Sequence, residues 1–117
     1  MLSDSTVVPD APRELKVDSK GSRVVVVSWK AGFDGNSKIL NYTVGISEDN
    51  QNFVDARCPG SASNACVVSG SSTNASLEDL LPWTMYYIRV FATNKVGRSG
   101  RSSVVNTTTD EEGTLDY

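Results

Sequence analysis

A two-residue alternation runs through residues 80–94, LLPWTMYYIRVFATN, and it constrains the fold more than any other feature of the chain. Successive side chains of a β-strand point to opposite faces of the sheet, so this period predicts a strand with one buried face. A helix would scatter the same residues around its axis. Pro82 cannot donate a hydrogen bond in a β-ladder, so we expect the strand to begin after it, at a corner. The apolar residues of the predicted inward face are Tyr86, Ile88, Val90 and Ala92.

Tyr86 begins this strand, and its hydroxyl needs a hydrogen-bond partner once the ring is buried. A backbone group of the preceding corner is within reach. The surrounding residues follow the spacing L-x-P-x-T-x-Y and then x-x-x-V-x-A-x-N, with Gly97 and Ser99 beyond. This pattern resembles the second half of a fibronectin type III domain, and the resemblance implies that Tyr86 is the tyrosine corner of a β-sandwich. Trp83 departs from the pattern, because the family usually has a small turn residue there.

Residues 23–30, RVVVVSWK, form a second alternating segment. If Trp29 is buried, Val25 and Val27 share its inward face, and the pattern resembles the second strand of the same family. The alternative is an exposed tryptophan at a binding surface; we favour the core. A third segment, residues 39–46, resembles the family's next strand. The predicted core consists of Val25, Val27, Trp29, Tyr42, Val44, Ile46, Leu77, Leu80, Tyr86, Ile88, Val90 and Ala92.

Shorter strands are expected at 14–18, 52–57, 75–80 and 103–109, and residues 66–68 form a possible extra strand. With no helical window anywhere, the chain is predicted to be all-β: an immunoglobulin-like antiparallel β-sandwich of seven strands in two sheets. The expected organisation has three parts. They are a disordered or non-native tail at 1–8, the fibronectin type III domain at 9–109, and an acidic linker or tail at 110–117.

Cys58 and Cys66 are the only cysteines of the chain, and they flank a short segment in which Pro59 and Gly60 signal a turn. This spacing suits a disulfide across a short excursion, which would stabilise the fold by about 2.5 kcal/mol on the chain-entropy model. The alternative is two partly buried free thiols. A single pair of cysteines cannot supply the usual four ligands of a structural zinc site.

Composition excludes several classes of function. The net charge is −3, without a dense basic patch, which disfavours nucleic acid and direct contact with an anionic membrane. No apolar run approaches the roughly 20 residues of a membrane helix, and the first residues do not resemble a signal peptide. Histidine is absent, so a hydroxyl nucleophile would lack its commonest base. We therefore predict no enzymatic activity, no cofactor and no metal.

Three sequons for N-linked glycosylation are present, at Asn41, Asn74 and Asn106. Each asparagine neighbours a residue predicted to face inward, so all three side chains should face outward. We expect glycan at one or more of them, above all at Asn74, if the protein passes through the secretory pathway.

Residues that break the core pattern are the candidates for contact with a partner. Lys95, Arg98 and Arg101 lie in or beside the loop after residue 94, near Arg89. These basic residues could bind a glycosaminoglycan or an acidic protein surface. More commonly, such residues form a solvated rim without a partner. The loop lacks the Arg-Gly-Asp tripeptide by which some members of the family bind integrins. Trp83 either caps the end of the core, which we favour, or anchors an interface.

Two functional interpretations follow from the resemblance. The first is an extracellular module of a cell-surface adhesion or receptor protein, which contacts other protein domains and acts as a spacer. The second is an intracellular structural module of a cytoskeletal or muscle filament protein, for which free thiols and empty sequons are expected. A cytokine-receptor domain is disfavoured, because residues 97–102 do not reproduce the WSxWS motif.

Overall fold

The computed structural model describes residues 5–59 and 65–112. In these ranges the chain forms eight β-strands, and no helix in them is long and apolar enough to cross a membrane. The strands are β1 (Arg13–Lys20), β2 (Val25–Lys30), β3 (Asn41–Ser47), β4 (Val54–Asp55), β5 (Cys66–Ser69), β6 (Asn74–Leu77), β7 (Met85–Thr93) and β8 (Val105–Thr108).

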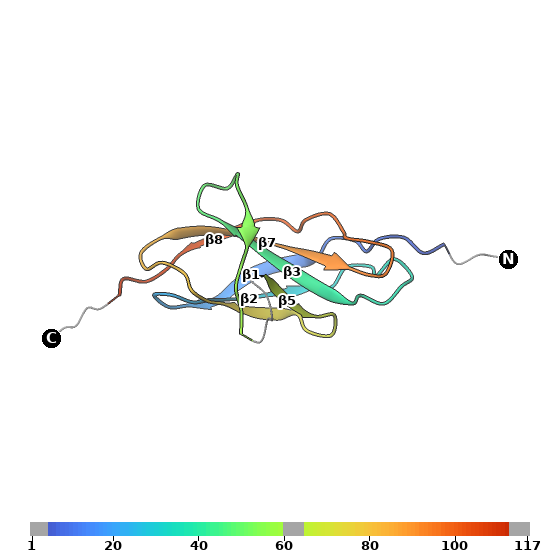
Figure 1. Cartoon of the computed structure of the whole chain (residues 1–117), viewed down its shortest axis with the longest axis horizontal. Helices are drawn as coiled ribbons and strands as arrows, with labels where there is room; N and C mark the ends of the chain where they lie inside the picture. The colour runs from blue at the N-terminus through green and yellow to red at the C-terminus, as the bar shows by residue number, and fades with distance from the viewer. Residues whose placement is uncertain (1–4, 60–64, 113–117) are drawn as a thin grey trace.

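The strands form two antiparallel sheets, which Figure 1 shows lengthwise. One sheet has the order β1-β2-β6, and the other has the order β4-β3-β7-β8, with β5 also paired to β3. The predicted immunoglobulin-like sandwich is confirmed, with eight strands in place of seven. The eighth is β5, the possible extra strand at 66–68. It forms because β4 pairs only with Gly45 and Ile46, so residues 41–44 of β3 remain available to β5.

The core lies between the sheets and holds the alternating residues of β2, β3 and β7. The rings of Trp29 and Tyr42 meet edge to face, with centroids 5.3 Å apart. All the predicted core residues are buried except Ile46, which is half-buried and packs against the margin of the core. Ile46 is near the end of β3 and lines a surface hollow described below, which is why water still reaches it.

The tyrosine corner precedes β7. The Leu81 N–H donates a 2.8 Å hydrogen bond to the Tyr86 hydroxyl, which confirms the partner expected from the sequence. The hydroxyl of buried Thr109 donates to the Leu81 carbonyl and accepts from the Thr84 N–H. These bonds fasten the corner to the end of β8, so the direction in which the chain enters β7 is set partly by a residue more than 20 positions further along the chain.

The loops gather at two poles. The N-terminal pole consists of residues 5–8, 31–38, 70–73 and 94–100; the C-terminal pole consists of residues 21–24, 48–53, 78–84 and 110–112. In Figure 1 the first described residues, in blue, and the last, in red, lie at opposite ends of the elongated molecule.

The segment at 5–8 differs from the expected disordered tail. The Val7 N–H donates to the Gly35 carbonyl at 2.9 Å, and the buried Asn94 side chain donates to the Val7 carbonyl at 2.7 Å. Gly35 has a φ of 78°, and a Cβ there would come within 2.1 Å of the Val7 oxygen. A glycine is therefore needed where this segment packs. Residues 1–4 of the predicted tail lie outside the described residues.

Candidate functional site

A stack of alternating arginine and phenylalanine side chains lies on the outer face of the five-stranded sheet. The guanidinium carbon of Arg89 is 4.0 Å from the ring centroid of Phe53 and 5.2 Å from that of Phe91. The guanidinium carbon of Arg98 is 4.4 Å from the centroid of Phe91. A cation within about 6 Å of an aromatic centroid is attracted by the negative face of the ring. We call these four residues the arginine–phenylalanine stack.

Strand alternation puts the stack on the surface. Ile88 and Val90 face the core, so Arg89 and Phe91 of β7 face outward. In the ladder with β3, Arg89 lies opposite Gly45 and Phe91 opposite Thr43. Gly45 has no side chain, and a hollow of about 140 Å³ remains between the stack and β4. The flat, partly aromatic face thus contains a shallow recess.

The two arginines differ in exposure. Arg89 is half-buried, and its Nε atom is buried without a hydrogen-bond partner among the described residues. Arg98 is exposed at the end of the stack. Guanidinium groups bind carboxylates through paired N–H donors, and a ring that holds such a group in place reduces the conformational entropy lost on binding. Chemically, the stack is suited to an acidic or aromatic protein surface.

The predicted basic cluster is only partly brought together. Arg89 and Arg98 meet through Phe91, whereas exposed Lys95 takes no part in the stack and Arg101 donates to the Ser102 carbonyl at 3.1 Å. Sequence reasoning missed both phenylalanines as functional candidates. The signal for Phe91 was present, because it occupies an outward position of β7 two residues from Arg89; Phe53 comes from a loop whose register could not be read from the sequence.

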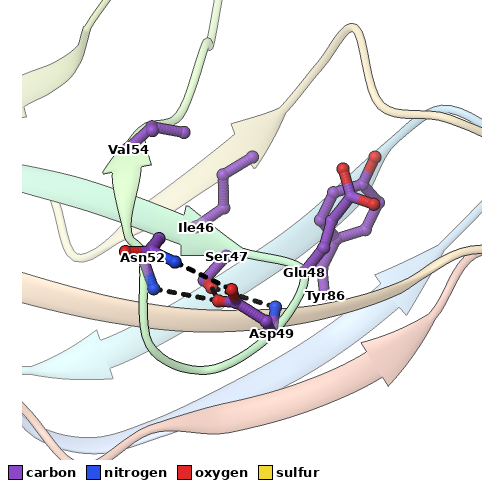
Figure 2. A pocket seen from close by; sticks show the side chains of 7 residues that line it. All are labelled: Ile46, Ser47, Glu48, Asp49, Asn52, Val54 and Tyr86. Carbon is purple, nitrogen blue, oxygen red and sulfur yellow. Dashed lines mark hydrogen bonds between the residues drawn. The ribbon is translucent and has the colours of Figure 1, made fainter.

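A second hollow, of about 240 Å³, lies at the turn between β3 and β4 and is lined by Ile46, Asp49, Val54 and Tyr86 among others (Figure 2). The Asp49 carboxylate accepts backbone N–H bonds from Gln51 and Asn52, both at 2.9 Å, and the Ser47 hydroxyl at 2.7 Å. These bonds hold the pKa of Asp49 well below its usual range. The carboxylate is committed to the turn, so we assign this hollow a structural role.

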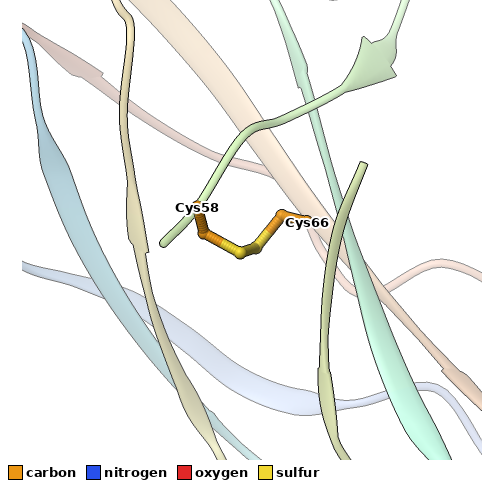
Figure 3. Close-up of a disulfide and its surroundings, with 2 residues drawn as sticks. All are labelled: Cys58 and Cys66. Carbon is orange, nitrogen blue, oxygen red and sulfur yellow. A yellow bond between two sulfur atoms is a disulfide. The ribbon is translucent and has the colours of Figure 1, made fainter. Parts of the chain in front are cut away.

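The cysteines form the predicted disulfide. Cys58 and Cys66 are joined with Cα atoms 5.1 Å apart, and both side chains are buried (Figure 3). The bond connects the segment after β4 to the start of β5, so it fastens the extra strand to the edge of the sheet. Residues 60–64 of the predicted excursion lie outside the described residues.

Trp83 is exposed, so the favoured prediction that it caps the core is wrong. Its exposed fraction is 68%, and the neighbouring apolar residues Leu81 and Met85 are 54% and 45% exposed. The end of the core is closed instead by Leu80 and Thr109, which are buried. The Trp83 backbone has a φ of 52°, in the left-handed region that a glycine adopts without strain. This explains why a small residue is usual there.

The three sequons occupy different positions in the sheets. Asn74 is exposed at the start of β6, and Asn106 is exposed on β8; both strands lie at sheet edges. Asn41 is half-buried on β3, paired on one side with Ser69 and on the other with Thr93. Among residues 5–59 and 65–112, no group of three or more acidic or cysteine side chains is placed to hold a metal ion.

Comparison with known families identifies the family to which most of the chain belongs. A family model described as the fibronectin type III domain matches residues 10–108. The chain belongs to this family. Its matching relatives include the cell adhesion molecule Dscam1 of Drosophila melanogaster, 36% identical over 90% of this chain and 5% of that protein. Contactin-1a of Danio rerio is 37% identical over 89% of this chain and 10% of its own length. The chain thus spans a small part of the relatives it matches.

Solved structures similar to this chain include domains of CNTN1 and of titin. The chicken CNTN1 FN1-FN3 domains superpose with a TM-score of 0.79 at 26% identity, covering 87% of this chain and 33% of that one. Domains A168-A170 from titin superpose with a TM-score of 0.76 at 30% identity, covering 89% of this chain and 33% of that one. In this fibronectin type III domain, the arginine–phenylalanine stack therefore lies on the outer face of a conventional sandwich.

Proposed function

We propose that this fibronectin type III domain is a non-enzymatic, extracellular module of a cell-surface adhesion or receptor protein. It contacts another protein through the outer face of its five-stranded sheet and acts as a spacer between neighbouring modules. The observation that carries the proposal is the arginine–phenylalanine stack, an outer-face cluster in which Phe53, Arg89 and Phe91 are half-buried and Arg98 is exposed. Aromatic residues and arginine are the side chains most enriched where proteins bind one another.

Two further observations support the extracellular setting. The similar curated proteins include Dscam1 and neural cell adhesion molecule L1-like protein, whose names describe cell adhesion. The Cys58–Cys66 disulfide also favours an oxidising compartment, because cytosolic thiols are kept reduced. The similarity to titin favours the second candidate, an intracellular structural module of a filament protein.

Thiol counting on the parent protein, isolated from its native source, separates these two settings. The protein is denatured without reductant, alkylated and digested. The masses of the peptides that contain Cys58 and Cys66 are then measured by mass spectrometry. We expect a disulfide-linked pair and no alkylation. Complete alkylation of both cysteines would favour the intracellular module and overturn the extracellular one.

The contact surface is tested by binding of the chain to intact cells from the tissue that expresses the parent protein. Arg98→Glu reverses the exposed charge of the stack and should abolish binding, whereas Arg13→Glu, on the opposite sheet, is the matched control and should leave it unchanged. Prior trypsin treatment of the cells should remove binding. Loss of binding after heparinase treatment would identify a glycosaminoglycan in place of a protein, and equal binding by both variants would exclude the stack.

A further inference from the structure

The sequon residue Asn106 lies on the same face of the molecule as the arginine–phenylalanine stack. In the ladder between β7 and β8, Asn106 is directly opposite Tyr87. The neighbouring Tyr86 is buried in the core, so Tyr87 and Asn106 point the other way, out of the five-stranded sheet. Any group attached to the Asn106 side chain therefore starts beside the Tyr87 ring, on the outer face.

Tyr87 is also the outward neighbour of the stack along β7. Tyr87 and Arg89 are two residues apart in this strand, which separates their Cα atoms by roughly 7 Å. Side chains directly opposite each other in an antiparallel ladder have Cβ atoms about 5 Å apart. A bulky N-linked oligosaccharide is larger than these separations. From Asn106 it can reach across Tyr87 to the guanidinium of Arg89.

Asn106 is accessible to modification. Its side chain is exposed, and β8 lies at the edge of the sheet, where it pairs only with β7. In N-glycosylation the side-chain amide nitrogen bonds to the anomeric carbon of a sugar and loses a proton, while the pyrophosphate of a lipid-linked oligosaccharide leaves. The product is a bulky, hydrated chain that begins next to the stack.

The other exposed sequon, at Asn74, lies on the opposite side of the sandwich. Asn74 belongs to β6, an edge strand of the three-stranded sheet. Its neighbour Ala75 is buried in the core, so the Asn74 side chain points outward from that sheet. A glycan on Asn74 is separated from the stack by both sheets. The two exposed sequons therefore have different consequences for the outer face of the five-stranded sheet.

We propose that N-glycosylation of Asn106 covers Tyr87 and the arginine–phenylalanine stack, and so closes the contact face of the domain. This inference rests on the proposed function, because the face that is closed is the one proposed to bind another protein. The unmodified domain binds through the stack, and the glycosylated domain does not. Occupancy of one asparagine thus decides whether the domain contacts a partner or acts only as a spacer.

Hydroxyl-radical footprinting measures the covering directly and needs no partner. The 117-residue chain is secreted by mammalian cells, and mass spectrometry first measures the occupancy of Asn106. Asn106→Gln should raise the oxidation of Tyr87 several-fold, whereas Asn74→Gln, the matched control, should not. Phe33, exposed at the N-terminal pole, is the internal reference. An unoccupied Asn106, or equal oxidation of Tyr87 in all three proteins, would overturn the proposal.

Binding of the same secreted proteins to intact cells tests the closure of the face. The Asn106→Gln chain should bind several-fold more than the glycosylated chain, and Asn74→Gln should bind no more than it. Arg98→Glu added to Asn106→Gln should abolish the gain. Equal binding by the glycosylated and Asn106→Gln chains, each sensitive to Arg98→Glu, would refute closure. If no form binds, the proposed contact fails, while the footprint still decides whether the glycan covers the face.

Discussion

At position 83 the backbone conformation favours a small residue such as glycine, but the chain has a bulky tryptophan. The corner before β7 needs a left-handed residue, and the chain has a tryptophan there whose ring lies largely in solvent. Alternation could not predict this exposure, because it applies to strands and Trp83 lies in the corner before one. The sequence did identify the residue as unusual, through its departure from a pattern in which a small residue is common.

Two substitutions separate the effect of the Trp83 side chain from that of its backbone. Trp83→Ala keeps the strained backbone and removes an exposed ring, so the free energy of unfolding should change by less than about 0.5 kcal/mol. Trp83→Gly relieves the strain and should be about 1 kcal/mol more stable than the alanine variant. Urea denaturation measures both. A loss of about 3 kcal/mol in the alanine variant, as for a buried aromatic, would contradict the exposed position.

Tyr86 illustrates a residue whose role follows from its own chemistry. Tyr86→Phe keeps the packing but leaves the Leu81 N–H without its acceptor, so we expect a loss of about 1.5 kcal/mol in unfolding free energy. Tyr87→Phe is the matched control: its neighbouring ring faces outward and takes part in no hydrogen bond among the described residues. Thermal and urea melts of both variants provide the measurement, and equal destabilisation would refute the assigned role of the corner.

At the scale of elements, β3 organises the five-stranded sheet. Its whole length pairs with β7, while its other side is shared by β4 and β5. The turn that leads from β3 to β4 is held by Asp49, whose carboxylate accepts hydrogen bonds from four groups of the same turn: the Ser47 hydroxyl, the Gln51 N–H, and the backbone and side-chain N–H groups of Asn52. This arrangement makes the turn sensitive to acid.

Acid should reduce the contribution of this turn to the stability of the fold. The pKa of Asp49 is lowered in the folded state, so its contribution to stability is fully present above the unfolded pKa of about 3.9. The contribution is lost as the pH falls below that value toward the folded pKa. Asp49→Asn should therefore reduce the slope of unfolding free energy against pH between about 4 and 2. Glu48→Gln, which removes an adjacent carboxylate outside these bonds, should leave that slope closer to the parent's; equal slopes for all three proteins would contradict this account.

For the molecule as a whole, the sequons at exposed positions both lie on sheet edges, where an unpaired strand invites association with another chain. Glycans on β6 and β8 would protect these edges, whereas one on Asn41 would have to stand between Ser69 and Thr93 of the neighbouring strands. This placement distinguishes sites that the sequence treats alike.

We therefore expect glycan at Asn74 and Asn106, and little at Asn41, when the chain is secreted by mammalian cells. Intact-mass analysis of the protein and of the variants Asn41→Gln, Asn74→Gln and Asn106→Gln measures this directly. Each of the last two should lose one glycan mass, and Asn41→Gln should retain the full glycan mass. An unglycosylated parent sample would contradict the prediction.

The strands and the residues that face the core were predictable from the sequence alone. The alternation in β2, β3 and β7 is local, and it determines which side chains share a face wherever the strand is placed. The spaced motif ending at Tyr86 and Asn94 identified the family for the same reason: its residues act within one corner and one strand. The disulfide could also be predicted from the sequence, because Cys58 and Cys66 are close in the chain.

The surfaces were decided only by the tertiary structure. Phe53 reaches Arg89 across 36 positions of the chain because β3 lies between their segments, and that register is a property of the assembled sheet. Likewise, Trp83 is left outside because Leu80 and Thr109 already close the core. Local periodicity thus determined the interior of this domain. Its exposed face and its poles depend on contacts between distant segments, and those contacts exist only once the two sheets have packed.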